Sequence, residues 1–366
     1  MKILFLLIFS STVFAANNRY FARSPKALLM GDAYTSIAED EYTLYYNPAI
    51  LARHKNFSFW AINPQITVSN PLEAEDQFED SGSTASEFTD TFLDTPIHFG
   101  LNGAPGFKMG RFGLTAILNN QTNLSVMNES TPMLSIDHHF DKGFIAGYGF
   151  PVNGDMALGL SIKYIERESI FGIYNVVSAR TLDLIRELED ADDISEYSEL
   201  IADAFGKTKG SGWGVDIGWD YVKGHSGNLF TMGFSLIDAY TILHTEDNEE
   251  NKEVQAQPLK ANFGTSYSMK KSGFGLLFSG DLRNLEDLEL DFQKRLKLGF
   301  ELMISPALSA LAGYNSGQYS YGIKFNFGLL KTYLGLYGVD SGEKLGQQIS
   351  KRGVVYVSLF DFNFDV

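Results

Sequence analysis

Apolar and polar residues alternate between positions 291 and 328. On one parity stand apolar residues, namely Phe292, Leu296, Leu298, Phe300, Leu302 and Ile304. On the other stand polar or small residues, namely Gln293, Arg295, Lys297, Gly299 and Glu301. Successive side chains of a strand point to opposite faces, so this period predicts strands with one apolar face and one wet face. The apolar face is too aromatic and too long for a small sandwich. It is typical of membrane-spanning hairpins with lipid outside and a polar lumen inside.

Other alternating stretches follow each other at the spacing of spanning strands, about ten residues each with turn signals between them. They lie near residues 56–69, 95–103, 110–127, 131–140, 142–150, 155–167, 213–221, 230–236, 259–267, 274–278, 329–339 and 352–364. From residue 155 onward, short connections such as 151–154 and 270–273 alternate with long or acidic ones such as 174–207 and 245–257. This predicts an antiparallel barrel with short turns at one end and long loops at the other.

The raw count of candidate strands is odd, but a single-chain barrel with both ends in the periplasm needs an even number. One of the early segments is therefore not an independent spanning strand. The alternation is weakest in 121–140, where Asn, Thr, Pro132 and two histidines dilute it. We therefore expect part of this segment to be a bent or outer extension of a neighbouring strand. The predicted fold is an all-β transmembrane barrel of about fourteen strands.

The first residues have the pattern of an export signal. Met1-Lys2 is cationic, residues 3–9 are apolar, and Val13-Phe14-Ala15 places small residues at a cleavage site. We expect cleavage after Ala15, which divides the chain into a signal peptide (1–15), an N-terminal segment (16–54) and a barrel (55–366). The chain has no cysteine, which excludes a disulfide framework, a Cys-based metal site and a lipid-anchor Cys.

Composition supports a barrel and narrows the partners. The mean hydropathy is −0.09, and Gly 35, Phe 29 and Tyr 18 fit strands whose two faces average out. A net charge of −16 argues against nucleic acid as a partner. The alternative is a soluble secreted β-protein with acidic loops.

One connection has helical periodicity. Apolar residues recur at helical spacing among Asp and Glu in 178–205, which predicts a helical insertion at about 176–206. Its apolar face would cap the barrel mouth, meet a partner, or pack on the adjacent loops.

The segment 20–53 does not alternate and carries a more specific pattern. Met30-Gly31, Ile37-Ala38 and above all Tyr45-Tyr46-Asn47-Pro48-Ala49 resemble the N-terminal plug of FadL-type outer-membrane transporters for hydrophobic compounds, and of related PorV-type barrels. The resemblance implies a fourteen-stranded barrel with its N-terminal segment folded into the lumen. It also implies passive uptake of hydrophobic or amphipathic molecules such as long-chain fatty acids. The alternative it leaves open is a PorV-like component of a protein secretion or surface-assembly system.

Candidate site residues fall into two groups. The plug and gating candidates are Asp40, Tyr45, Asn47, Pro48 and Ala49. Pro48 restricts Asn47 to extended backbone, so this pair either takes part in gating or only shapes a turn. The ligand candidates are the lumen-parity cations Lys163, Lys260, Arg295, Lys297 and Lys324 for a carboxylate, and Tyr34 and Phe57 for an apolar tail. The alternative for the cations is pairing with Asp216, Asp220, Asp281 and Glu301.

Enzymatic and metal sites are not expected. The two histidines of Asp137-His138-His139 would face opposite sides of a strand and could not bind one ion together. We predict no catalytic residue, metal or cofactor. The expected location is the outer membrane of a Gram-negative-type cell. The expected partners are outer-membrane lipid and lipopolysaccharide, a hydrophobic small molecule or a secretion protein, and no nucleic acid.

Overall fold

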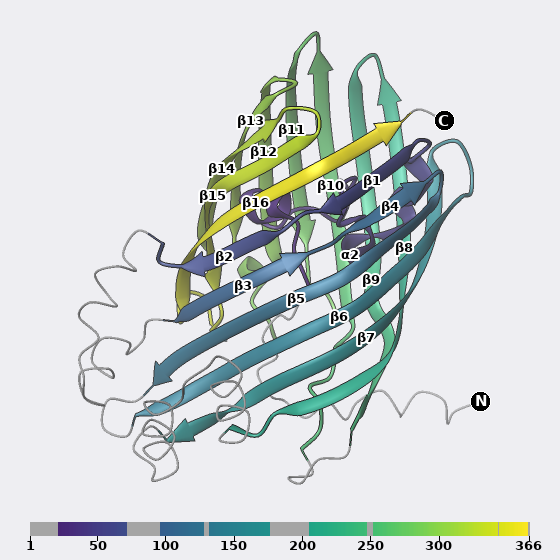
Figure 1. The fold of residues 1–366 in the computed structure, drawn as a ribbon. Coiled ribbons are helices and arrows are strands. Elements are labelled where there is room, and N and C mark those ends of the chain that lie inside the picture. Colours follow the sequence, from purple (N-terminus) through teal and green to yellow (C-terminus); the bar gives the residue numbers. More distant parts are fainter. Residues whose placement is uncertain are drawn as a thin grey trace.

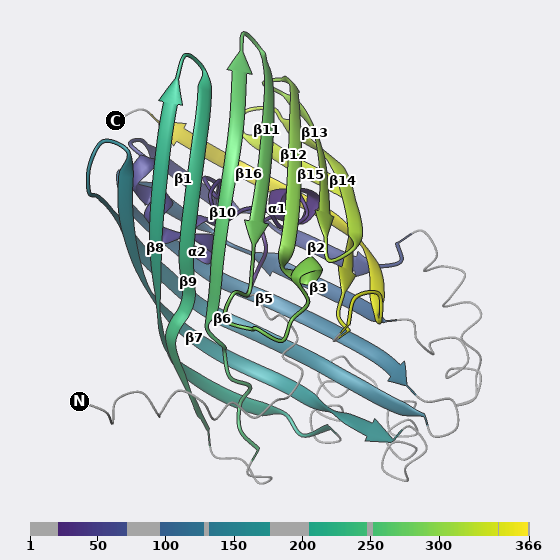
Figure 2. The same cartoon turned by 180° about the vertical axis from the view of Figure 1, so that it is seen from behind.

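A closed antiparallel barrel of fourteen strands forms the wall of the molecule, which confirms the predicted fold class (Figures 1 and 2). The computed structural model describes residues 21–71, 96–127, 132–175, 205–246, 252–342 and 344–364. The predicted signal peptide, most of the helical insertion at 176–206 and the acidic connection at 72–95 lie outside these residues.

Sixteen hydrogen-bonded segments make up the wall. They are β1 (Phe57–Ile62), β2 (Gln65–Ser69), β3 (Ile97–Gly103), β4 (Gly106–Met109), β5 (Phe112–Met127), β6 (Met133–Pro151), β7 (Met156–Asn175), β8 (Thr208–His225), β9 (Asn228–Thr245), β10 (Lys260–Lys271), β11 (Phe274–Leu282), β12 (Leu296–Ser305), β13 (Leu308–Asn315), β14 (Gln318–Asn326), β15 (Leu330–Asp340) and β16 (Ile349–Phe364). β1 and β2 both pair with β16, and β3 and β4 both pair with β5. Each of these two couples is therefore one interrupted strand, which gives fourteen.

The length of β6 explains why the alternation gave one segment more than the barrel has strands. This strand runs without a break from Met133 to Pro151 and so joins two segments that the alternation separates. Its outer part pairs with the outer part of β5 from Asn119↔Asp141 to Met127↔Met133. The prediction that 121–140 is not an independent spanning strand is confirmed. β4 is an element that the alternation did not single out. The rule of long outer loops fails once, because Ser316-Gly317 joins β13 to β14 with two residues at positive φ.

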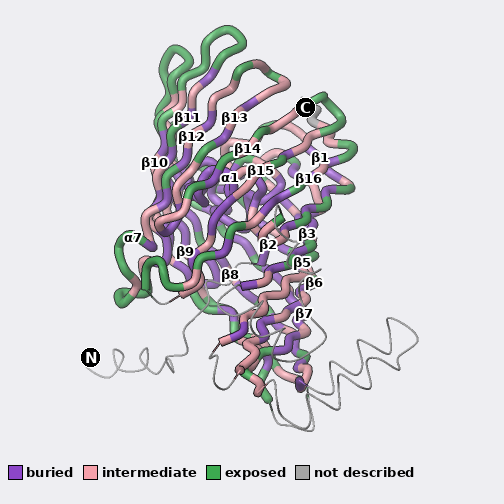
Figure 3. The backbone as a smooth tube through the Cα atoms, turned by 90° about the vertical axis from the view of Figure 1, so that its left-hand side faces the viewer, coloured by how far each residue is buried: buried purple, intermediate pink, exposed green. Residues whose placement is uncertain are grey.

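Side chains sort by parity as expected for a barrel in lipid. On β12, Leu298 is 45% exposed on the outer face, whereas Lys297 and Glu301 are 6% and 2% exposed in the lumen. Figure 3 shows this alternation along the strands. Among the described residues, no helix is long and apolar enough to cross a membrane.

The hydrophobic core lies inside the barrel. Residues 21–54, which we call the lumen segment, contain α1 (Pro25–Leu29), α2 (Thr43–Tyr46) and the 3₁₀ helix η1 (Pro48–Arg53). η1 packs on β6, β7 and β8, and α1 packs on β13 to β16. Helix α7 (Phe292–Arg295) directly precedes β12. Nearly every side chain of the lumen segment is buried, so it fills the barrel across its width.

Candidate functional site

The Asn47-Pro48-Ala49 turn joins the lumen segment to the wall. Asn47 has the extended backbone that a following proline favours, with φ −161° and ψ 103°. Its Oδ1 accepts a hydrogen bond from the Ala49 amide at 3.1 Å and so caps η1. Its Nδ2 donates to the carbonyl oxygens of Thr35 at 3.2 Å and Trp219 at 3.0 Å. Asn47 therefore shapes the turn and also binds strand β8.

Two glycines of the wall make room for this turn. A Cβ on Gly159 of β7 would collide with the backbone of Pro48 and Ala49. A Cβ on Gly218 of β8 would collide with Asn47 Oδ1 and approach the Ala49 nitrogen to 2.9 Å. The absence of side chains at these lumen positions allows the backbones of turn and wall to approach closely.

Asp40 organises the interior of the lumen segment. Its Oδ2 accepts hydrogen bonds from the hydroxyls of Ser24 at 2.6 Å and Tyr34 at 2.7 Å. These bonds of the Asp40 carboxylate lie within the lumen segment and not on the wall. The wall contact comes instead from Lys108 of β4, whose Nζ donates to the backbone oxygens of Glu39 at 2.7 Å and Asp40 at 2.5 Å.

Tyr45, another predicted plug residue, bonds the wall directly. Its hydroxyl donates to a backbone carbonyl, that of Ala116 on β5, at 2.9 Å. A backbone carbonyl does not stand out as a polar residue in a sequence, so this partner could not be predicted.

Three acids on the wall bond residues of the lumen segment. Asp220 accepts a hydrogen bond from Arg53 Nε at 2.7 Å. Glu301 lies 2.7 Å from Lys26 Nζ. Asp281 accepts hydrogen bonds from the backbone amides of Tyr34 at 2.8 Å and Thr35 at 2.7 Å. The alternative that the predicted cations pair with these acids is therefore wrong for Asp220, Asp281 and Glu301, whose partners are in the lumen segment. It is correct for Asp216, which bonds Lys163.

Glu41 is the centre of a further buried contact. Its Oε2 lies 2.9 Å from Lys331 Nζ, and its Oε1 accepts the Tyr356 hydroxyl. Lys331 also lies 2.8 Å from Asp361. Burial raises the pKa of the Glu41 carboxyl, but the Lys331 ammonium and the Tyr356 hydroxyl outweigh this and hold the pKa below its ordinary value.

Three of the five predicted ligand cations have protein partners that the structure identifies. Lys163 Nζ lies 2.6 Å from both Asp216 and Asp238. Lys297 Nζ donates to the Lys294 carbonyl at 2.7 Å and to Ser316 Oγ at 2.8 Å. Lys324 Nζ lies 5.8 Å from the Tyr333 ring centroid. Lys260 is buried on the lumen face of β10. The structure brings Lys163 and Lys260 together at one cavity, whose lining does not include Lys297 or Lys324.

Two predicted ligand residues lie elsewhere. Arg295 is half-buried at the end of α7, before the first residue of β12, so strand parity does not place it. Phe57 shares the outward parity of β1 with the exposed Phe59, while Ser58 and Trp60 face inward. Its ring lies 6.3 Å from that of Phe107. The expectation that Phe57 lines the lumen is wrong, because both parities of β1 carry aromatic rings and the inward one belongs to Trp60. Tyr34 is buried in the lumen segment.

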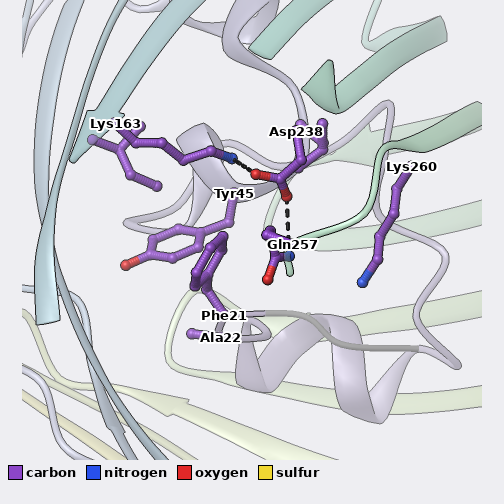
Figure 4. Close-up of a pocket in the computed structure, with 9 residues that line it drawn as sticks. Phe21, Ala22, Tyr45, Lys163, Asp238, Gln257 and Lys260 are labelled. Atoms are coloured by element: carbon purple, nitrogen blue, oxygen red, sulfur yellow. Dashed lines mark hydrogen bonds and ion pairs between the residues drawn. The ribbon is translucent and has the colours of Figure 1, made fainter. Parts of the chain in front are cut away.

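A small cavity lies between the lumen segment and the wall (Figure 4). One side is apolar, and the other carries charged and amide groups. It is lined by Phe21, Ala22, Tyr45, Ile145, Lys163, Ile237, Asp238, Gln257 and Lys260. Its free space holds about one water molecule. The site is amphipathic in character but is too small in this conformation for a larger molecule.

The wall is interrupted beside the lumen segment. Between the partners Trp60↔Gly106 and Gln65↔Asn102, the first interrupted strand makes no ladder pair with the second. The sequence there reads Asn63-Pro64 on one side and Ala104-Pro105 on the other. The Ala104 carbonyl accepts Trp60 Nε1 at 2.7 Å and Asn63 Nδ2 at 2.9 Å, and the Ala104 amide donates to Asn63 Oδ1 at 2.9 Å. Two side chains thus replace the missing ladder.

The interruption is adjacent to the contacts of the lumen segment. Lys108, which holds the backbone of Glu39 and Asp40, lies 5.4 Å from the Trp60 ring centroid. Tyr42 donates to Gln65 Oε1 at 3.3 Å. Sequence reasoning missed Lys108, Trp60 and Asn63. The only available signal was the recurrence of proline in two neighbouring strand patterns.

No family model and no curated protein matches the chain. Among solved structures, the toluene transporter TodX of Pseudomonas putida is 9% identical, with a TM-score of 0.46 over 94% of this chain and 98% of that chain. The toluene transporter TbuX of Ralstonia pickettii is 10% identical, with a TM-score of 0.45 over 94% and 99%. A Pseudomonas aeruginosa FadL homologue is 9% identical, with a TM-score of 0.44 over 94% and 99%.

Proposed function

We propose that the protein is an outer-membrane channel for passive uptake of small hydrophobic or amphipathic molecules, with the lumen segment as its plug. The observation that supports this most is the wall interruption at Asn63-Pro64 and Ala104-Pro105, which lies beside the lumen segment. A molecule released there would enter the lipid sideways and would not need to pass the filled lumen.

The hydrogen bonds at the interruption would allow the barrel wall to open there. In hydrocarbon, every backbone polar group needs a partner within the protein, and strand ladders normally supply it. At Ala104 the partners are the side chains of Asn63 and Trp60. Side chains can rotate away without unpairing whole strands, so this position opens at lower cost than any intact ladder. Lys108 then links that movement to the lumen segment.

The cavity in Figure 4 indicates the kind of cargo. Phe21, Tyr45 and Ile237 would contact an apolar body, and Lys163 and Lys260 would stand near an anionic or polar head. Long-chain fatty acids have this character. The cavity holds about one water molecule, so the lumen segment or another part of the cavity wall must move before such a cargo can bind.

Restoring the ladder tests the proposal. In Pro64→Ala/Pro105→Ala both positions regain an amide donor, so strands across the interruption can pair continuously. Uptake of a fluorescent long-chain fatty acid by cells carrying this variant should fall several-fold relative to wild type at equal surface amounts. The matched control is Pro306→Ala, in the turn between β12 and β13. Equal uptake by wild type and the double variant would count against lateral release.

A second function is favoured by the filled lumen. A barrel whose interior is occupied by buried ion pairs also suits a PorV-like component that acts through protein contacts, with lipopolysaccharide around it. Recovery of one fixed protein partner on purification, together with fatty-acid uptake no higher than in cells lacking the protein, would support this alternative.

A further inference from the structure

The chain that enters β10 folds into the lumen. Within residues 252–259, which we call the strap, Val254 and Gln257 are buried. The Val254 amide donates to Thr245 Oγ1 at 2.9 Å. Val254 packs on Gly210 of β8, where a Cβ would lie 2.7 Å from Val254 Cγ1. The strap therefore occupies space that a side chain at Gly210 would take.

One guanidinium fastens the strap. Arg167 of β7 is 1% exposed and donates from Nη1 to the Gln255 carbonyl at 2.9 Å and from Nη2 to Gln257 Oε1 at 2.9 Å. Its Nε lies 2.6 Å from Asp141 Oδ1, and its Cζ lies 5.4 Å from the Phe21 ring centroid. Arg167 thus connects β6, β7, the strap and the lumen segment.

A bulge in β9 supplies the second attachment. Pairing with β8 shifts register between Val215 and Ile217, and Asp238 has φ +56°, a strained value for a residue with a side chain. This backbone turns the Asp238 carboxylate toward Gln257, whose Nε2 donates to it at 3.0 Å (Figure 4). Gln257 is also part of the cavity lining.

One side chain of the strap lacks hydrogen-bond partners in this position. Both side-chain amide atoms of Gln255 are buried, and neither has a hydrogen-bond partner in the structure. An amide that loses its water partners without replacement raises the free energy of that conformation. The strap is therefore held in this position by a few specific hydrogen bonds, while the unpaired Gln255 amide raises the free energy of the position.

We propose that the strap is a movable cover over the cavity, attached through Gln257 to Arg167 and Asp238, and that its withdrawal admits a small amphipathic molecule. This inference rests on the proposed function, because it concerns entry to the same lumen. Withdrawal would remove Gln257 from the cavity wall and give Gln255 access to water.

Thiol labelling measures the opening directly. The chain has no cysteine, so Ile145→Cys places a single thiol at the cavity wall. The probe is a small cationic methanethiosulfonate added to detergent-extracted protein, with folding checked by heat-modifiable gel mobility. Adding Gln257→Ala should raise the labelling rate about tenfold, because two hydrogen bonds to charged groups no longer hold the strap closed.

Matched controls separate opening from general loosening. Gln121→Ala, on the inward parity of β5, should leave the rate at Ile145→Cys unchanged. A thiol at the buried Leu311, introduced as Leu311→Cys, should label equally slowly with and without Gln257→Ala. An unchanged rate at Ile145→Cys in the Gln257→Ala background overturns the proposal, and so does equal acceleration at Leu311→Cys.

A locked strap distinguishes the two proposals. Thr245→Cys/Val254→Cys, bridged by a short bifunctional methanethiosulfonate, should lose fatty-acid uptake and regain it on reduction. Uptake that persists after bridging overturns the strap inference while the channel function stands. Absence of uptake in the unmodified, unbridged protein counts against the channel itself.

Discussion

At the scale of single residues, Glu41 gives the clearest pH dependence. Its pKa is lowered in the folded protein, since Lys331 and Tyr356 outweigh the effect of burial. A group of this kind contributes stability above its unfolded pKa of about 4.5, and that contribution is lost as the pH falls through the lower folded value. Glu41→Gln should therefore destabilise the protein at pH 7 by about 1–3 kcal/mol, because Lys331 loses the Glu41 carboxylate but keeps Asp361 as a partner.

The measurement is thermal unfolding of purified protein at pH 7 and at about pH 3, below the unfolded pKa of Glu. The difference between wild type and Glu41→Gln should shrink at the lower pH. Glu39→Gln is the control, because the Glu39 side chain is 62% exposed and forms only a surface pair with Arg53. A difference that is the same at both pH values would show that the Glu41 charge is not what stabilises this contact.

At the scale of elements, the fit between turn and wall is the feature most sensitive to volume. Gly159→Ala places a methyl group against the backbone of Pro48 and Ala49. Neither backbone can yield without moving η1, so the variant should lose about 1–3 kcal/mol of stability. Limited proteolysis should also cut the lumen segment faster. Gly154→Ala, in a turn where a Cβ meets nothing within 4 Å, should behave as wild type. Equal protection in both variants would mean that the turn is not held against β7.

The elements themselves were largely predictable, and the exceptions have physical reasons. Alternation identifies spanning strands because lipid and lumen impose opposite preferences on successive residues. It fails at Phe57, where the first strand is short and both parities carry aromatic rings. It fails at Arg295 because α7 ends there and the strand begins one residue later.

The partners of the lumen charges were not predictable. Asp220 and Arg53 are far apart in sequence, and only the path of the lumen segment through the barrel brings them together. Alternation says which residues face inward, but it carries no information on what stands opposite them. The Asn47-Pro48-Ala49 motif could be singled out because its turn chemistry is local, whereas its bond to Trp219 is not.

At the scale of the whole molecule, the barrel is closed, its outer face is apolar and its lumen is filled by residues 21–54. Such a barrel should not act as an open aqueous pore. The routes for cargo that we propose are the cavity beneath the strap and the wall interruption at Ala104, both next to the lumen segment.

The most direct test measures hydrophobic uptake and ion conductance on the same preparation. Purified protein is placed in lipid vesicles for uptake of a fluorescent long-chain fatty acid, and in planar bilayers for conductance. We expect uptake well above that of protein-free vesicles, together with almost no steady ion current. A steady porin-like current would contradict the filled lumen, and uptake equal to that of protein-free vesicles would contradict the channel.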